Sequence, residues 1–340
     1  MSKSISLRPK IGLGVVPTHL RFVGCLVPDE NGRYPRNEAG EIKVVEGMRE
    51  LCEASEVALT CVQISVFPGC HEGDVDEMIE QLRGLGLDVD LILMLGGVDP
   101  KNPADEDGVV EQLLPSVKAA VKHGIETVSS TSIDVWMAPE GTGLTGEAFD
   151  AAVAQNVKVH LRVIEEAGVI GSSVKSWHIE FLRPGEFRTF TDINKGRAVV
   201  QAANEKMGSK FFKLIVDAAH CGNSGLSIDE NIATIKELAE AGELGAFHAT
   251  PPTTRGCLST DEGWVGALLA AAAGTGELEK VYVEMFHHED DALAPLRDLQ
   301  VGFGVDTRDG RSYNETMVDG LADVARRLNN YVARGFIPGA

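Results

Sequence analysis

Three features that would place this sequence outside the cell or in a membrane are missing from it. No apolar stretch is long enough to span a bilayer; LLAAAAG at 268–274, for example, is short and flanked by charge. The N-terminus, MSKSISLRPK, lacks the apolar core of a secretory signal, and none of the six cysteines forms a CxxC pair. We therefore expect separate thiols in a reducing compartment, a cytoplasmic protein and no membrane partner.

An excess of positive charge is also missing. The 340 residues include 31 Lys and Arg against 51 Asp and Glu, which gives a formal net charge of -20. Such a field repels phosphate backbones and anionic lipid surfaces, so we expect no nucleic-acid partner. A neutral or cationic small molecule is easier to reconcile with this charge.

What the sequence does have is a regular alternation of short apolar runs with longer segments of helical period. Near-continuous apolar runs are typical of strands buried on both faces of a parallel sheet. The eight runs occupy residues 11–16, 57–66, 89–95, 125–130, 174–181, 211–220, 244–248 and 280–286. Near the C-terminus, Leu321, Val324, Leu328 and Val332 form one apolar helical stripe. Eight strand–helix units predict an α/β fold, a (β/α)8 TIM barrel, with residues 1–340 as a single domain.

The main alternative is a doubly wound open sheet, which also alternates strands and helices. Eight units exceed the usual count for such a sheet, and no run is followed by a GxGxxG that opens a helix. Two long polar segments, 17–43 and 97–113, follow predicted strands. We expect them as extended loops on the C-terminal face of the barrel, where active-site loops gather.

Ionisable residues recur at the C-terminal ends of the fifth to eighth predicted strands. Glu180, Asp217, His248 and Glu284 each come directly after apolar positions. At the same depth of successive barrel strands they would converge, and three crowded carboxylates would repel one another unless a cation lay between them. Three carboxylates and one imidazole suit Mn²⁺, Mg²⁺ or Co²⁺ better than a structural Zn²⁺. The residues therefore predict one divalent-metal site; the alternative is four unrelated polar groups bonded to backbone or water.

This constellation resembles the xylose-isomerase-like TIM-barrel superfamily, in particular its branch of ketose 3-epimerases and related sugar isomerases. In that branch a Glu, an Asp, a His and a Glu on strands five to eight bind one divalent metal. The resemblance covers the chain from about the fifth strand to the C-terminus. Four local motifs carry it further: the D-x-x-H pair Asp217–His220, His248 followed by Arg255 in HATPPTTRG, Glu186 six residues after Glu180, and an E-x-F strand end at Glu284.

The resemblance implies an enzyme that isomerises or epimerises a sugar. Its metal, with Mn²⁺ the expected ion, would hold two neighbouring substrate oxygens, and proton abstraction next to the metal-bound carbonyl would give a cis-enediolate. Glu180 and Glu284 would act as catalytic acid and base on opposite faces of the reacting carbon. Glu186, His220 and Arg255 would bind substrate; the alternative for each is a solvated or surface-paired side chain.

One residue departs from the epimerase pattern. His178 stands two positions before Glu180, so a strand would turn both side chains toward the barrel interior. This H-x-E pair resembles the catalytic subunit of C-glycoside deglycosidases, in which the reaction would be a metal-dependent elimination of an aglycone from a 3-keto-glycoside and His178 a catalytic base. The alternative is a packed, hydrogen-bonded interior histidine. In either case we expect a small carbohydrate substrate and a homo-oligomer, with or without a small second subunit.

Overall fold

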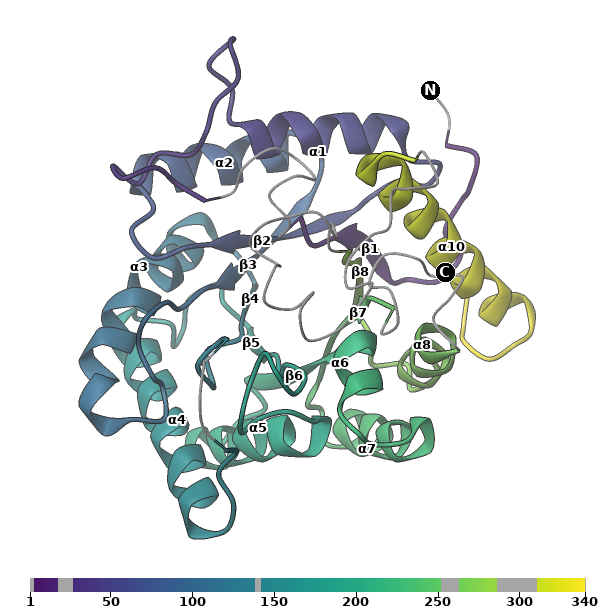
Figure 1. The fold of residues 1–340 in the computed structure, drawn as a ribbon. Helices are drawn as coiled ribbons and strands as arrows, with labels where there is room; N and C mark the ends of the chain where they lie inside the picture. Colours follow the sequence, from purple (N-terminus) through teal and green to yellow (C-terminus); the bar gives the residue numbers. More distant parts are fainter. Residues whose placement is uncertain (1–2, 18–26, 138–141, 252–262, 286–310, 340) are drawn as a thin grey trace.

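The computed structural model describes residues 3–17, 27–137, 142–251, 263–285 and 311–339. Eight parallel strands close into a barrel in chain order, and the last strand pairs with the first (Figure 1). The strands are β1 (Gly12–Val15), β2 (Cys61–Val66), β3 (Asp88–Leu93), β4 (Thr127–Ser130), β5 (Ser176–Ile179), β6 (Phe212–Asp217), β7 (Leu244–Ala249) and β8 (Lys280–Val283). The predicted (β/α)8 barrel is confirmed, and each of the eight apolar runs contains or overlaps one strand.

Helices surround the barrel (Figure 1), and the main hydrophobic core lies between them and the strands. They are α1 (Lys43–Ala54), α2 (Glu72–Gly84), α3 (Glu106–His123), α4 (Glu147–Glu166), α5 (Ile193–Met207), α6 (Ala218–Asn223), α7 (Ile228–Glu240), α8 (Trp264–Gly274) and α10 (Tyr313–Ala333). The stripe predicted near the C-terminus is confirmed in α10, where Leu321, Val324 and Leu328 are buried. This helix begins with a capping box between Ser312 and Glu315, which satisfies its first backbone N–H groups. That residues 1–340 form one domain stays a prediction.

The chain leaves β6 earlier than its apolar run indicated. The run extends to residue 220, but β6 ends at Asp217 and α6 begins at the next residue. The Asp217 side chain accepts the backbone N–H of His220 at 2.7 Å and so caps α6. One carboxylate thus ends the strand and begins the helix, and His220 is a helical residue held beside Asp217.

The two polar segments predicted as loops both follow strands. Residues 18–26 of the first segment lie outside the described residues. The second segment is irregular only as far as Asn102, because a turn of 3-10 helix (Pro103–Asp105) leads directly into α3. The sequence explains this helix start: the Asn102 side chain caps the backbone N–H of Ala104, and a proline follows at the first helical position.

The barrel interior is more polar than the layer outside it. A small apolar cluster lies there, made of Val16, Cys61, Ile92, Ala246 and Tyr282. Next to it, the buried carboxylate of Asp90 forms an ion pair with Lys280 at 2.8 Å and accepts the hydroxyl of Tyr282 at 2.6 Å. The interior therefore offers hydrogen-bond partners to polar side chains, which lets the strands carry ionisable groups inward.

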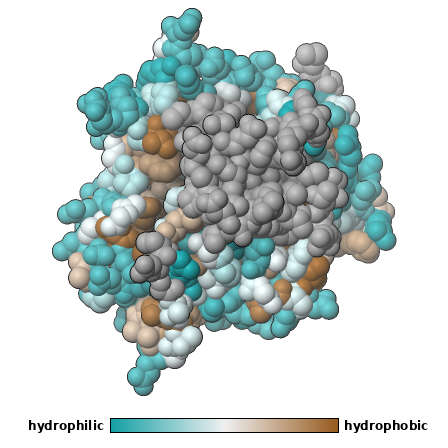
Figure 2. Space-filling model, viewed as in Figure 1, coloured by the Kyte–Doolittle hydropathy of each residue, from teal (hydrophilic) through white to brown (hydrophobic). Residues whose placement is uncertain are grey.

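Several expectations about the surface and the thiols can be compared with the described residues. In the view of Figure 2 the described surface is largely hydrophilic, with hydrophobic patches between. No described helix is both long and apolar enough to cross a bilayer. Four cysteines are free thiols, as predicted, namely Cys52, Cys61, Cys70 and Cys221. The other two cysteines of the sequence lie outside the described residues.

A chain of hydrogen bonds ties α4 to β4 and β5. Trp177 Nε1 donates to Ser130 Oγ at 2.9 Å, and the Ser130 and Ser132 hydroxyls lie 2.6 Å apart. Ser132 Oγ in turn lies 2.7 Å from His160 Nε2. The other ring nitrogen, His160 Nδ1, lies 2.7 Å from the carbonyl oxygen of Asn156. An indole N–H can only donate and a carbonyl can only accept, so His160 donates at Nδ1 and accepts at Nε2. Burial lowers the pKa of His160 to about 4 and keeps the imidazole neutral.

We expect this buried histidine to make the protein less stable in mild acid. The unfolded chain takes up a proton on His160 below its ordinary pKa of 6.5, whereas the folded protein does so only near pH 4. The contribution of His160 to the free energy of unfolding should be constant above that window and should fall by up to about 3 kcal/mol through it. Urea unfolding in EDTA between about pH 7.5 and pH 4.5 measures the fall, and His160→Gln, which does not titrate, should show a shallower one. If the free energy of unfolding changed with pH in the same way in the wild type and in His160→Gln, the prediction would be wrong.

Candidate metal centre

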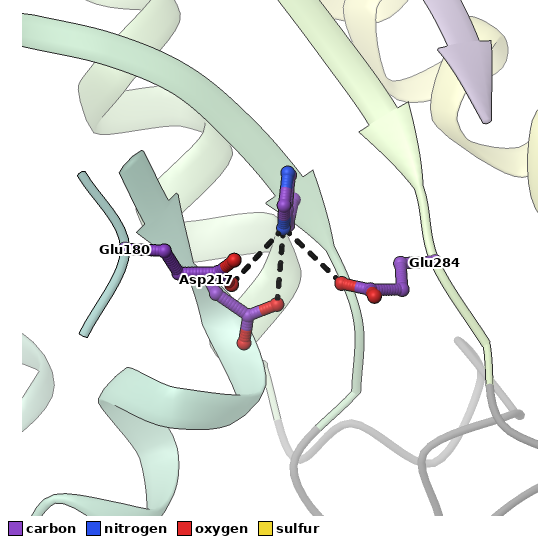
Figure 3. Close-up of side chains that lie close together, drawn as sticks. Glu180, Asp217 and Glu284 are labelled. Atoms are coloured by element: carbon purple, nitrogen blue, oxygen red, sulfur yellow. Dashed lines mark ion pairs between the residues drawn. The ribbon is translucent and has the colours of Figure 1, made fainter. Parts of the chain in front are cut away.

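The four ionisable residues predicted at the strand ends lie together in the structure (Figure 3). Asp217 ends β6 and pairs in register with His248 of β7, while Glu180 and Glu284 directly follow β5 and β8. Each residue offers one donor atom, and these atoms all lie within 4.8 Å of one another. All four side chains are buried. The closed barrel thus brings residues far apart in the sequence to one point at the carboxyl ends of its strands.

His248 lies at the centre of this cluster. Its Nδ1 atom is 3.1 Å from Glu284 Oε2, 3.2 Å from Glu180 Oε1 and 3.8 Å from Asp217 Oδ2. In the view of Figure 3, Glu180 and Glu284 lie on either side of the cluster and the carboxylate of Asp217 lies between them. Asp217 Oδ2 is fully buried and has no hydrogen-bond partner among the described residues. A buried carboxylate oxygen in this position is stabilised by a cation, and the donor set of three carboxylates and an imidazole fits a divalent one.

The charges of the cluster shift the pKa values of its members in different directions. Burial opposes a charged His248, but the carboxylates of Glu180 and Glu284 outweigh burial and raise the pKa of this imidazole well above its usual range. Burial also opposes the charge on Glu180, yet the imidazoles of His248 and His220 lower the pKa of its carboxyl group. For Glu284 burial prevails and raises the pKa. A protonated His248 therefore supplies positive charge among the carboxylates when no metal is bound.

Two of the three predicted substrate-binding residues adjoin the cluster. His220 Nδ1 lies 3.3 Å from Glu180 Oε1, and His220 Nε2 lies 3.5 Å from Glu186 Oε2. Burial opposes a charge on His220, but Asp217, Glu180 and Glu186 raise its pKa to about 10. The sequence interpretation missed Arg183, a buried guanidinium whose Nε lies 3.5 Å from Glu186 Oε2. The described site therefore extends from the four-residue cluster through His220 to a buried Arg183–Glu186 pair.

His178 faces the barrel interior, as its position before Glu180 predicted. Its Nδ1 accepts the backbone N–H of Ala246 at 3.2 Å, and its Nε2 lies 3.1 Å from Ser176 Oγ. Burial lowers the pKa of His178 well below its usual range, so the ring is neutral. Neither of these hydrogen bonds involves the four-residue cluster, and together they suit the packed, hydrogen-bonded interpretation. A role of His178 as a base stays a prediction.

The structure does not describe two of the predicted residues, and it adds one residue that was not predicted. Arg255 lies outside the described residues, and so does Phe286 of the E-x-F motif. The unexpected residue is Gln63 of β2, whose Oε1 lies 2.7 Å from His248 Nε2. One feature of the sequence points to Gln63, because it is an amide in the middle of the buried strand CVQISV.

Fold and site together define a TIM barrel with a buried carboxylate–imidazole cluster at the carboxyl ends of β5 to β8. No family model and no curated protein matches the chain. Among solved structures, a D-allulose 3-epimerase from Methylomonas sp. matches with a TM-score of 0.68 at 16% identity, over 95% of this chain and 99% of its own. A putative sugar phosphate isomerase/epimerase from Anabaena variabilis matches with a TM-score of 0.71 at 16% identity, over 95% of this chain and 99% of its own. A 3-keto-D-glucoside 4-epimerase from E. coli matches with a TM-score of 0.53 at 13% identity, over 85% of this chain and 97% of its own.

The chain therefore shares the TIM-barrel fold of these structures, and the predicted resemblance is confirmed at the level of the fold. Three of the similar structures are sugar epimerases or carry that description. One fold of this kind supports many activities, so an activity has to be argued from the residues of the site.

Proposed function

We propose that the protein is a divalent-metal-dependent sugar isomerase or epimerase, which removes a proton from the carbon next to a carbonyl. The observation that carries the proposal is the buried cluster of three carboxylates and one imidazole at the ends of four successive strands. The likeness in fold to sugar epimerases supports it. Mn²⁺ is the ion we propose, with Mg²⁺ and Co²⁺ as alternatives.

Glu180, Asp217, His248 and Glu284 are the proposed ligands. When bound, the metal would polarise a substrate carbonyl and so make the neighbouring C–H group more acidic. Glu180 and Glu284 lie on opposite sides of the cluster in the view of Figure 3, an arrangement suited to removing a proton from one face of a carbon and returning one on the other. Both carboxylates are buried, so their charges act in a medium of low dielectric constant.

The neighbouring residues have chemistry suited to a carbohydrate. A charged His220 and the carboxylate of Glu186 offer donors and acceptors for sugar hydroxyl groups beside Glu180. Arg255 remains a proposed substrate-binding residue on the sequence alone. The homo-oligomer, the small second subunit and the cytoplasmic location stay predictions.

Solvent deuterium exchange tests this proposal. The Mn²⁺-loaded protein should catalyse deuterium incorporation from D₂O at C3, or at another carbon next to the carbonyl, of at least one member of a panel of free ketoses. An epimeric or isomeric sugar should appear in the same sample, and EDTA should abolish both signals. A Mn²⁺-loaded protein that exchanges none of the panel would contradict the proposal.

Elimination from a 3-keto-glycoside is the second candidate, because His178 and Glu180 both face the barrel interior. It predicts release of an aglycone from 3-keto-glycosides, loss of that release in His178→Gln, and no exchange into free ketoses. We place it second because the hydrogen bonds of His178 to Ser176 and to the Ala246 backbone already account for its burial.

A further inference from the structure

A chain of hydrogen bonds crosses the barrel interior behind His248. Gln63 Oε1 lies 2.7 Å from His248 Nε2, Gln63 Nε2 lies 2.8 Å from Ser129 Oγ, and Ser129 Oγ lies 3.2 Å from the carbonyl oxygen of Leu91. The three side chains are completely or almost completely inaccessible to solvent. The hydrogen-bonded chain runs from β7 to β2, then β4, then β3, so it ties the imidazole of His248 to three strands that carry none of the carboxylates of the cluster.

The carbonyl group of Leu91, at the end of this chain of hydrogen bonds, sets which group donates and which accepts in each of them. A backbone carbonyl can only accept, so the Ser129 hydroxyl donates its single proton to Leu91. Ser129 Oγ must then accept from Gln63, which places the amide nitrogen of Gln63 toward Ser129. The amide oxygen of Gln63 consequently faces His248 and accepts a proton from its Nε2. Nδ1 of His248 is left as the nitrogen that faces the three carboxylates.

The opposite arrangement shows why this direction matters. If the Gln63 amide were reversed, its nitrogen would donate to His248 Nε2, and a neutral imidazole would carry its proton on Nδ1. That proton would point at the position where the donor atoms of Glu180, Asp217 and Glu284 converge. A proton there would compete directly with a cation, because a nitrogen binds a metal through its lone pair.

We propose that Gln63, held by Ser129, is the positioning residue of the metal centre: it fixes the tautomer and the ring orientation of His248 so that Nδ1 is the ligand atom. This inference rests on the metal site proposed above and adds two residues to it. An amide is suited to the task because it accepts from Nε2 without adding a fourth negative charge, which a carboxylate at the same place would add.

Calorimetric titration with Mn²⁺ alone, on the full chain, tests the inference. Gln63→Leu removes the acceptor and should lower Mn²⁺ affinity about 10–100-fold, the usual effect of losing a group that orients a metal ligand. Gln63→Glu restores an acceptor and should recover most of that loss. Ser129→Ala keeps Gln63 but frees its amide to turn, so it should lower the affinity less. Thr127→Val, a substitution of similar size two residues earlier in β4, is the control and should bind like wild type.

A second measurement on the wild type does not depend on any variant being folded. With histidine labelled with ¹⁵N at Nδ1, electron spin-echo spectroscopy of bound Mn²⁺ should show the coupling of a directly ligated ¹⁵N nucleus. A coupling from Nε2 instead, or unchanged Mn²⁺ affinity in both Gln63→Leu and Ser129→Ala, would overturn the role of Gln63 and leave the metal site intact. A wild type that binds no Mn²⁺ would overturn the metal site as well.

Discussion

Asp217→Asn is expected to abolish tight Mn²⁺ binding, and with it the proposed activity, while the barrel stays folded. Asparagine keeps an oxygen that can accept the backbone N–H of His220, so the cap of α6 is retained. It loses the negative charge and the second carboxylate oxygen, which is the buried atom 3.8 Å from His248 Nδ1. Losing a group that merely orients a ligand costs about 10–100-fold in affinity, so losing a charged ligand should cost more than about 100-fold.

Calorimetry with Mn²⁺ and thermal melts with and without the ion measure this effect. Mn²⁺ should raise the melting temperature of the wild type but not that of Asp217→Asn, because only a bound ligand stabilises the folded state. In EDTA the variant should still unfold in one cooperative transition near that of the wild type, because the cap of α6 is retained. The lost carboxylate repels Glu284 but attracts the charged His220, so the two electrostatic effects of removing it oppose each other. Asp229→Asn, an exposed residue in the first turn of α7, is the matched control and should bind Mn²⁺ normally. Undiminished Mn²⁺ affinity in Asp217→Asn would mean that the cluster is not a metal site.

The barrel and the four-residue cluster are predictable from the sequence for one physical reason. Strands such as β2 and β7 are buried on both faces, so most of their residues are apolar and the strands are easy to recognise. An ionisable residue at the end of such a run, like Asp217 or Glu284, is then conspicuous. The parallel strands of a closed barrel end on the same face, so residues at those ends must converge.

The contacts of the residues around the cluster cannot be predicted from the strand or helix periodicity of the sequence. The hydrogen bond between Gln63 and His248 depends on which interior row each side chain occupies once the barrel has closed. Arg183 lies in an irregular segment after β5, where neither strand nor helix spacing applies. For His178, strand alternation indicates an inward side chain, but not that the Ala246 backbone would donate to its Nδ1. Tertiary partners of this kind become visible only in the folded chain.

Glu180→Gln and Glu284→Gln are expected to stop the interconversion of epimers in complementary ways. Glutamine keeps a neutral oxygen that can still face the metal but cannot take up a proton. Each variant should therefore lose about 10²–10⁴-fold in kcat at saturating Mn²⁺, the range of effects for removing a general acid or base. The two carboxylates lie on opposite sides of the cluster in the view of Figure 3. On the proposed mechanism each variant should therefore retain a base on one face of the substrate carbon.

Deuterium exchange with each epimer as the starting sugar distinguishes the two roles. One epimer presents its proton to Glu180 and the other to Glu284, so Glu284→Gln should exchange the first and Glu180→Gln the second, without inversion in either case. Metal content has to be verified in both variants, because both carboxylates are proposed ligands. Glu277→Gln, an exposed residue between α8 and β8, is the matched control and should exchange and interconvert both epimers. If one fully loaded variant loses exchange of both epimers while the other still exchanges both, one carboxylate alone moves the proton and the two-face mechanism is wrong.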